Sequence, residues 1–158
     1  MGSFNNKIAA EFNPPRKWVL SRALSYKNEE IDSETLEKVG VKVKSDRISV
    51  SKGFVTDLAS VTRMCWMFIA PWDIARAAII HDLLYKRIRQ YRAANEDVHD
   101  VNVEEVQRTY KPAKKASDDV FLMGMKDAEP PVAKWKIHSA YNAVKLFGRW
   151  SIIPREED

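Results

Sequence analysis

Cysteine is almost absent from this sequence, which holds one among 158 residues. That residue, Cys65, cannot form an internal disulfide, and the count excludes a zinc site built from several cysteines. Its neighbours are Met64 and Trp66, so its surroundings suit a small buried hydrophobe better than a nucleophile.

Glycine and long apolar runs are also scarce. The five glycines form no phosphate-binding loop, and the chain carries no HExxH, GxSxG or CxxC motif. No apolar run reaches the roughly 20 residues that cross a bilayer. The first residues lack the basic start and hydrophobic block of a secretory signal. We therefore expect a chain that folds in the cytoplasm where it is made, without a transmembrane segment.

The composition is that of an ordinary folded protein, with 45% hydrophobic and 30% charged residues. A chain of this length suits a single domain over residues 1–158, with its core at about 17–150. The formal net charge of +4 comes from 26 basic and 22 acidic residues. This excess is small and spread along the chain, and no specific nucleic-acid motif accompanies it.

The first half of the sequence is predicted to be β-rich, because β-branched residues alternate there with Lys, Ser and Arg. Pro14 and Pro15 exclude a helix at the start of this region. A hairpin turn is expected at Ser45-Asp46, and Gly53 ends the alternation. The predicted strands cover residues 18–26, 39–43 and 47–50, with a loop over 28–36.

The second half is predicted to be helical, because apolar residues recur at the spacing of one helix face. Asp73 is the expected cap of the first helix, Pro112 the expected start of the second, and Gly148 the expected stop of the third. The predicted helices cover residues 73–92, 112–127 and 132–147, with a loop over 93–102. The predicted fold class is α+β, a short antiparallel β-sheet followed by a three-helix bundle.

His81 is the first candidate functional residue, because it shares the apolar face of the first predicted helix with Tyr85. A histidine on such a face is more often a core residue than a catalytic one. Asp118, however, lies among apolar residues of the next helix, where an unpaired carboxylate is costly to bury. If these helices pack antiparallel, Asp118 can bond one imidazole nitrogen of His81 and leave the other to activate a water.

Three more carboxylates complete the candidate site. Asp82 can hold a hard cation together with backbone carbonyls. Asp57 follows a turn at Gly53 and either bonds backbone amides or serves as a metal ligand. Asp119 is either a supporting residue or a solvated charge. The sequence thus predicts His81 and Asp118 as catalytic residues, Asp82 and Asp57 as ligands of a divalent cation (calcium or zinc), and Tyr85 and Asp119 as supporting residues.

Four motifs, in order along the chain, resemble a phage and prophage family. They read GFVTDLASVTR, ARAAIIHDLLY, ASDDVFLMGM and AYNAVKLFG. On these motifs the chain is similar to domain-of-unknown-function family 1353, over roughly Trp18 to Trp150. The resemblance implies a bacteriophage or prophage origin and synthesis in the host cytoplasm, and it makes association with the virion an expectation to test.

The segments HDLLY and SDDVF are also similar to the two catalytic helices of phospholipase A2 enzymes. This second resemblance implies that His81 is the general base, that Asp82 binds calcium, and that Asp118 orients His81. The chain departs from those enzymes in one respect. No Gly-rich calcium loop precedes the helix, since Gly53 is the only glycine in residues 41–80.

Three functions from different classes are consistent with these observations. The first is a metal-dependent hydrolase acting on phospholipid or peptidoglycan of the host envelope, which requires a site open to solvent. The second is a structural virion component of the tail or neck, in which contacts with other virion proteins accompany a site that is buried and internally bonded. The third is an inhibitor that binds a host protein through a tryptophan-rich surface remote from His81.

Overall fold

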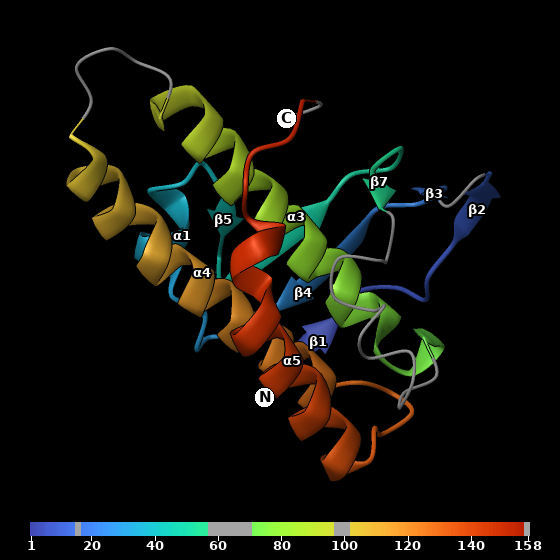
Figure 1. Ribbon diagram of the computed structural model, residues 1–158. Helices are drawn as coiled ribbons and strands as arrows, with labels where there is room; N and C mark the ends of the chain where they lie inside the picture. The colour runs from blue at the N-terminus through green and yellow to red at the C-terminus, as the bar shows by residue number, and fades with distance from the viewer. Residues whose placement is uncertain (15–16, 57–70, 97–101, 157–158) are drawn as a thin grey trace.

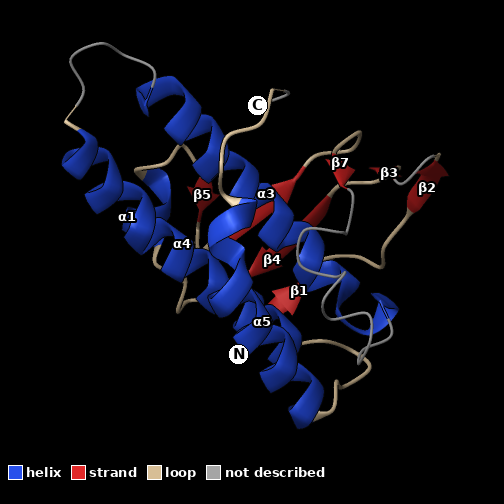
Figure 2. Ribbon diagram, viewed as in Figure 1, coloured by secondary structure: helices blue, strands red, loops and turns tan. Residues whose placement is uncertain are grey.

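The computed structural model describes residues 1–14, 17–56, 71–96 and 102–156. Within these ranges the chain forms two small antiparallel sheets and four helices, shown in Figures 1 and 2. The architecture is α+β, as the sequence predicts. The strands divide between two sheets, whereas the sequence analysis placed them in one.

The first sheet has the strand order β1 (Ser3–Phe4), β4 (Leu24–Lys27), β6 (Arg47–Val50), β5 (Val43–Lys44). Tyr26 of β4 pairs with Ile48 of β6, and both side chains are fully buried. The predicted hairpin turn between β5 and β6 is confirmed. Its two residues, Ser45 and Asp46, have φ angles of 49° and 57°, the left-handed conformation that two-residue hairpins require.

The second sheet has the order β2 (Ala10–Asn13), β3 (Lys17–Leu20), β7 (Val55–Thr56). The single strand predicted over residues 18–26 is wrong, because β3 and β4 belong to different sheets. The chain changes sheets after Leu20, where the Ser21 amide bonds Ala9 and the Leu20 amide bonds Phe54. Strand β7 ends at Thr56, a residue that reaches the candidate site.

A short helix, α1 (Ser33–Glu37), replaces the loop predicted over residues 28–36. Asp32 caps it by accepting a hydrogen bond from the Thr35 amide at 3.1 Å. Leu36 is fully buried and fixes the helix to the core. A helix of five residues shows no apolar period, so the sequence pattern did not reveal it.

The three long helices are all longer than predicted. They are α3 (Pro71–Glu96), α4 (Val103–Lys126) and α5 (Lys134–Ser151). Helix α4 nevertheless ends one residue before its predicted end, and α5 begins two residues after its predicted start. Asp73 lies inside α3 and not directly before it, and α3 continues into the predicted loop. Pro112 lies inside α4, which begins at an Asn102 cap whose side chain accepts from the Glu104 amide. Gly148 does not end α5 but lies within it, buried against α3.

Helix α3 is the centre of the arrangement. It packs against β4 and β6 on one side and against α4, which runs antiparallel to it, on another. Helix α5 packs on α4 and lies across the α3–α4 pair in Figure 1. In the described ranges, no helix is long and apolar enough to span a bilayer. Candidate residues on α3 and α4 thus lie at an interface that α5 covers.

Candidate functional site

The antiparallel packing of α3 and α4 brings His81 and Asp118 together, as the sequence predicts. His81 Nε2 lies 3.1 Å from Asp118 Oδ1. His81 is completely buried and Asp118 is 2% exposed. The rings of Tyr85 and Phe121 pack against the His81 ring, and all three side chains belong to the buried interior. The pair therefore lies in the core between the two helices rather than in a cleft open to solvent.

Two further donors satisfy the Asp118 carboxylate. The Tyr85 hydroxyl donates to Oδ1 at 2.7 Å, and Lys114 Nζ donates to Oδ2 at 2.7 Å. Lys114 also reaches the Val144 carbonyl of α5 at 3.4 Å. A buried carboxylate is tolerated when it is paired and hydrogen-bonded in this way. Tyr85, the predicted supporting residue, thus shares the Asp118 carboxylate with His81.

The surroundings set the protonation state of this pair. Burial lowers the pKa of His81 below its ordinary value of 6.5, although Asp118 opposes the effect. Burial alone would raise the pKa of Asp118, but hydrogen bonds from His81, Lys114 and Tyr85 outweigh it and the pKa falls. At neutral pH the carboxylate is therefore ionised and the imidazole neutral. Burial and Asp118 raise the pKa of Tyr85, which stays a hydrogen-bond donor.

The hydrogen-bond network also fixes the tautomer of His81. An ionised carboxylate only accepts hydrogen bonds, so the Nε2 that faces Asp118 must carry the ring proton. In the neutral ring, Nδ1 then carries a lone pair. Nδ1 is the one buried side-chain nitrogen or oxygen among the described residues that has no hydrogen-bond partner. His81 thus presents an unpaired base in an apolar setting, with the rings of Tyr85 and Phe121 at 4.0 and 5.0 Å.

Asp82 lies next to this pair but has different partners. Its Oδ2 accepts a hydrogen bond from the Thr56 hydroxyl at the end of β7, and the side chain is 9% exposed. This contact joins the second sheet to α3. Asp57, the other predicted cation ligand, follows Thr56 in the chain and lies outside the described residues.

Asp119 does not belong to the His81 cluster. Its Oδ1 accepts from the Tyr141 hydroxyl and its Oδ2 from Lys115, both at 2.8 Å. Burial, then the hydrogen bond to Asp119, raises the pKa of Tyr141 to about 12. The two adjacent carboxylates of α4 therefore serve different contacts. Asp118 faces α3, and Asp119 faces solvent and α5.

Sequence reasoning missed three residues of the site. Lys114 precedes Asp118 by four residues, a spacing typical of helical ion pairs, so this signal was present in the sequence. Thr56 and Gly148 are distant from His81 in sequence, and nothing local indicated their contacts. A Cβ on Gly148 would overlap the Tyr85 hydroxyl, so this glycine lets α5 approach α3.

The described residues supply few ligands for a metal ion. Outside residues 15–16, 57–70, 97–101 and 157–158, no three His, Cys, Asp or Glu side chains are arranged to hold one. Asp118 is already paired with Lys114, and His81 Nε2 is already bonded to Asp118. Asp82, the predicted cation ligand that lies within the described residues, already accepts a hydrogen bond from Thr56.

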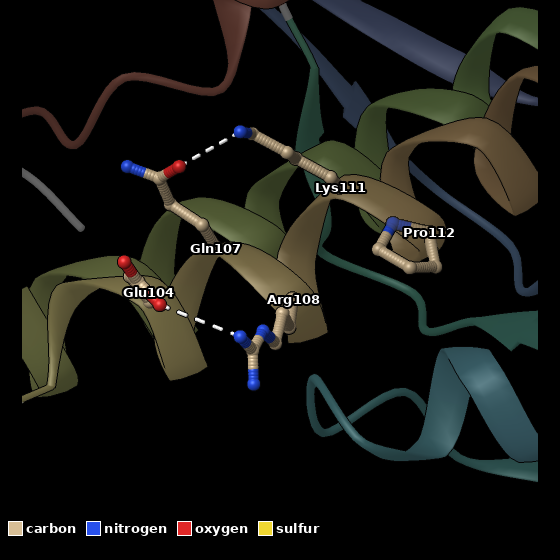
Figure 3. Close-up of a pocket in the computed structure, with 5 residues that line it drawn as sticks. All are labelled: Glu104, Gln107, Arg108, Lys111 and Pro112. Atoms are coloured by element: carbon tan, nitrogen blue, oxygen red, sulfur yellow. Dashed lines mark hydrogen bonds and ion pairs between the residues drawn. The ribbon is translucent and has the colours of Figure 1, made fainter.

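A shallow depression on the outer side of α4 offers a contrasting environment (Figure 3). Glu104, Gln107, Arg108, Lys111 and Pro112 line it. Its polar side chains pair along the helix, Arg108 with Glu104 at 3.4 Å and Lys111 with Gln107 at 2.7 Å. Such exposed pairs at four-residue spacing are ordinary surface features. We therefore assign the candidate site to the His81 cluster.

The fold and the site together define an α+β protein with a histidine–carboxylate pair buried between two antiparallel helices. The family described as "Protein of unknown function (DUF1353)" matches residues 33–144, more than half of the chain. The chain belongs to this family. The match includes all six predicted site residues and ends before Gly148. No curated protein and no solved structure matches the chain.

Proposed function

We propose that this protein is a hydrolase in which His81 Nδ1 accepts the proton of an attacking water. Because His81 is completely buried here, the proposal requires the packing over the ring to open before water and substrate can reach Nδ1. The observation that carries the proposal is the buried, unpartnered Nδ1 on a ring whose Nε2 is held by Asp118. A histidine retained only for packing is expected to have both nitrogens satisfied, because an unpaired buried polar atom costs about 1–3 kcal/mol.

The proposed reaction uses the chemistry already present in the cluster. As the water oxygen attacks an acyl carbonyl carbon, His81 Nδ1 takes one of its protons. The imidazolium that forms is stabilised by the ionised Asp118, which Lys114 and Tyr85 hold in place. His81 then returns the proton to the leaving oxygen or nitrogen. The lowered pKa of His81 keeps the ring neutral, and thus active as a base, at pH 7.

A divalent cation is part of the proposal. Asp82, with Asp57 as the second ligand, would hold calcium beside His81. When bound, such an ion polarises the carbonyl under attack and stabilises the oxyanion. The support is the chemistry of the two carboxylates and the position of Asp82 directly after His81.

The proposed substrate is a component of the host envelope. This follows from the resemblance to a phage family, together with the resemblance of HDLLY and SDDVF to phospholipase A2 helices. A phospholipid ester is the first substrate to test, and peptidoglycan is the second. Synthesis in the host cytoplasm and action at its envelope belong to the same proposal.

The experiment compares hydrolysis of phospholipid vesicles and of peptidoglycan, with calcium and with a chelator. His81→Gln keeps a donor toward Asp118 but removes the base, so it should fold and lose activity by about 10²-fold or more. His138→Gln, at an exposed histidine of α5, is the matched control and should retain activity. A folded wild-type protein without activity on either substrate, or an active His81→Gln variant, contradicts the proposal.

A structural virion component is the second candidate, and the burial of the pair favours it. His81, Tyr85 and Asp118 are at most 2% exposed and bond one another across α3 and α4. In that case the cluster fixes the helix pair and the unpaired Nδ1 has no role. Detection of the protein in purified particles, combined with a His81→Gln variant that assembles normally, would support this alternative.

A further inference from the structure

The outward face of α5 carries a stripe of exposed apolar side chains. At about 100° per residue, Trp135, Leu146 and Trp150 fall within about 60° of one another around the helix. Trp135, Leu146 and Trp150 are 55%, 64% and 52% exposed, and Phe147 and Ile153 beside them are 39% and 49% exposed. Phe147 stacks on Trp150 with ring centroids 5.8 Å apart. Exposed aromatic and aliphatic side chains that cluster in this way mark an interaction surface.

The fold prevents this stripe from turning inward. The opposite face of α5 is buried, with Val144 and Gly148 against α3 and α4. The end of the helix is tied to α3, since Arg89 bonds the Ser151 carbonyl at 3.2 Å and Arg92 bonds the Ile152 carbonyl at 2.7 Å. The apolar stripe is therefore held on the surface.

The Lys, Arg, Asp and Glu side chains that α5 itself carries have one sign. From residue 130 to residue 154 the chain has four basic residues and no acidic one. The basic residues are Lys134, Lys136, Lys145 and Arg149. The Arg149 guanidinium lies 4.2 Å from the Trp150 ring centroid, so a cation and an aromatic side chain share the same site on the surface.

We propose that α5 binds the surface of an anionic phospholipid bilayer, lying in the plane of the interface. Exposed Trp and Leu beside Lys and Arg are the composition of helices that rest in the headgroup region. A bilayer fits the stripe better than a protein partner because every Lys and Arg of α5 adds positive charge and the helix has no Asp or Glu, which matches an anionic lipid surface. The proposal stands on the exposed face of α5 and does not depend on hydrolysis by His81.

The test is sedimentation of the full chain with vesicles of phosphatidylglycerol and phosphatidylcholine, and with vesicles of phosphatidylcholine alone. Binding is expected with the anionic vesicles and should weaken as salt is added. Removing two cations in Lys145→Gln/Arg149→Gln should weaken binding by roughly 30-fold, since each basic residue contributes about 1 kcal/mol near such a surface. Leu146→Ser/Trp150→Ser should weaken it by at least about tenfold.

Matched variants elsewhere on the surface distinguish vesicle binding through α5 from binding that depends only on net charge or on any exposed apolar side chain. Lys42→Gln/Lys52→Gln has the same change in net charge, and Phe12→Ser/Val103→Ser removes two side chains that are 54% and 59% exposed. Both should bind like wild type, as should His81→Gln. Failure of the wild-type chain to bind anionic vesicles overturns the proposal, and so does equal loss in the control variants. Self-association through α5 without vesicle binding also overturns it.

Discussion

Gly148 of α5 lies so close to Tyr85 of α3 that a Cβ at this position would overlap the tyrosine hydroxyl and come within 3.2 Å of its Cζ. The same hydroxyl donates to Asp118, which in turn holds His81. Helix α5 therefore contacts the candidate site through a residue with no side chain. The outer face of that helix is the surface proposed to meet a bilayer.

Gly148→Ala should destabilise the protein despite the better helix propensity of alanine. Overpacking at a buried contact typically costs about 1–3 kcal/mol, which exceeds the roughly 1 kcal/mol that alanine gains in a helix. Chemical denaturation measures the change. Tyr85→Phe removes the overlapping hydroxyl, so the double variant should lose less stability than the two single variants together. Simple additivity would show that the two residues are not coupled.

Asp118→Asn and Asp119→Asn test the division of roles between adjacent carboxylates. Asp118→Asn leaves the partly buried Lys114 without its charge partner and removes the buried carboxylate that holds His81 and Tyr85, so a loss of about 3–5 kcal/mol in unfolding free energy is expected. Asp119→Asn should cost less than about 1 kcal/mol, because its ion pair with Lys115 is on the surface. Equal losses in the two variants would contradict the packing described for α4.

The His81 cluster and its neighbour Asp119 show how far the sequence could predict this structure. The apolar period placed His81, Tyr85 and Asp118 on facing stripes, and burial of polar groups predicts that such residues bond one another. The sequence did not assign Asp119 to a different environment from Asp118, because adjacent residues on a helix differ by only one step of rotation and that step decides between core and solvent.

The missed features depend on contacts between distant segments. Gly148 was interpreted as a helix stop, because glycine commonly ends helices, but its value here is the space it leaves for Tyr85. The strand predicted over residues 18–26 is two strands in the structure, because backbone hydrogen bonds to residues 9 and 54 hold the chain where it changes sheets. The alternation of apolar and polar residues within the segment does not reveal such distant partners. Pro112 suited a helix start, yet the Asn102 cap lies ten residues earlier.

The stability of the protein should fall as the pH drops below about 6.5. The pKa of His81 is lower in the folded state than the 6.5 of the unfolded chain. At pH values between these two pKa values, the unfolded chain therefore binds a proton that the native state does not. The loss is at most about 1.4 kcal/mol per pH unit for one group. His81→Gln should flatten this part of the profile. The lowered pKa of Asp118 causes a separate loss of stability, which begins as the pH falls toward 3.8, the ordinary pKa of this carboxyl group.

The tautomer of His81 can be observed directly. In ¹⁵N spectra of the imidazole at pH 7, Nε2 should appear protonated and Nδ1 unprotonated, because the ionised Asp118 accepts from Nε2. The signal should remain that of a neutral ring just below pH 6.5, because burial lowers the pKa of His81. A protonated Nδ1 in the native protein at pH 7 would remove the base on which the proposed hydrolysis depends.

Calcium binding should depend on the Asp82 carboxylate rather than on the hydrogen bond that it accepts. Asp82→Asn removes the charge but keeps an oxygen that can accept from Thr56, so calorimetric titration should show binding to wild type and none to this variant. Thr56→Val removes the hydrogen bond and keeps the charge, and it should still bind calcium. Asp119→Asn is a second control for net charge. If folded wild type binds no calcium at millimolar concentrations, the cation is not part of the site, and hydrolysis by His81 and Asp118 alone has to be judged from activity in the presence of a chelator.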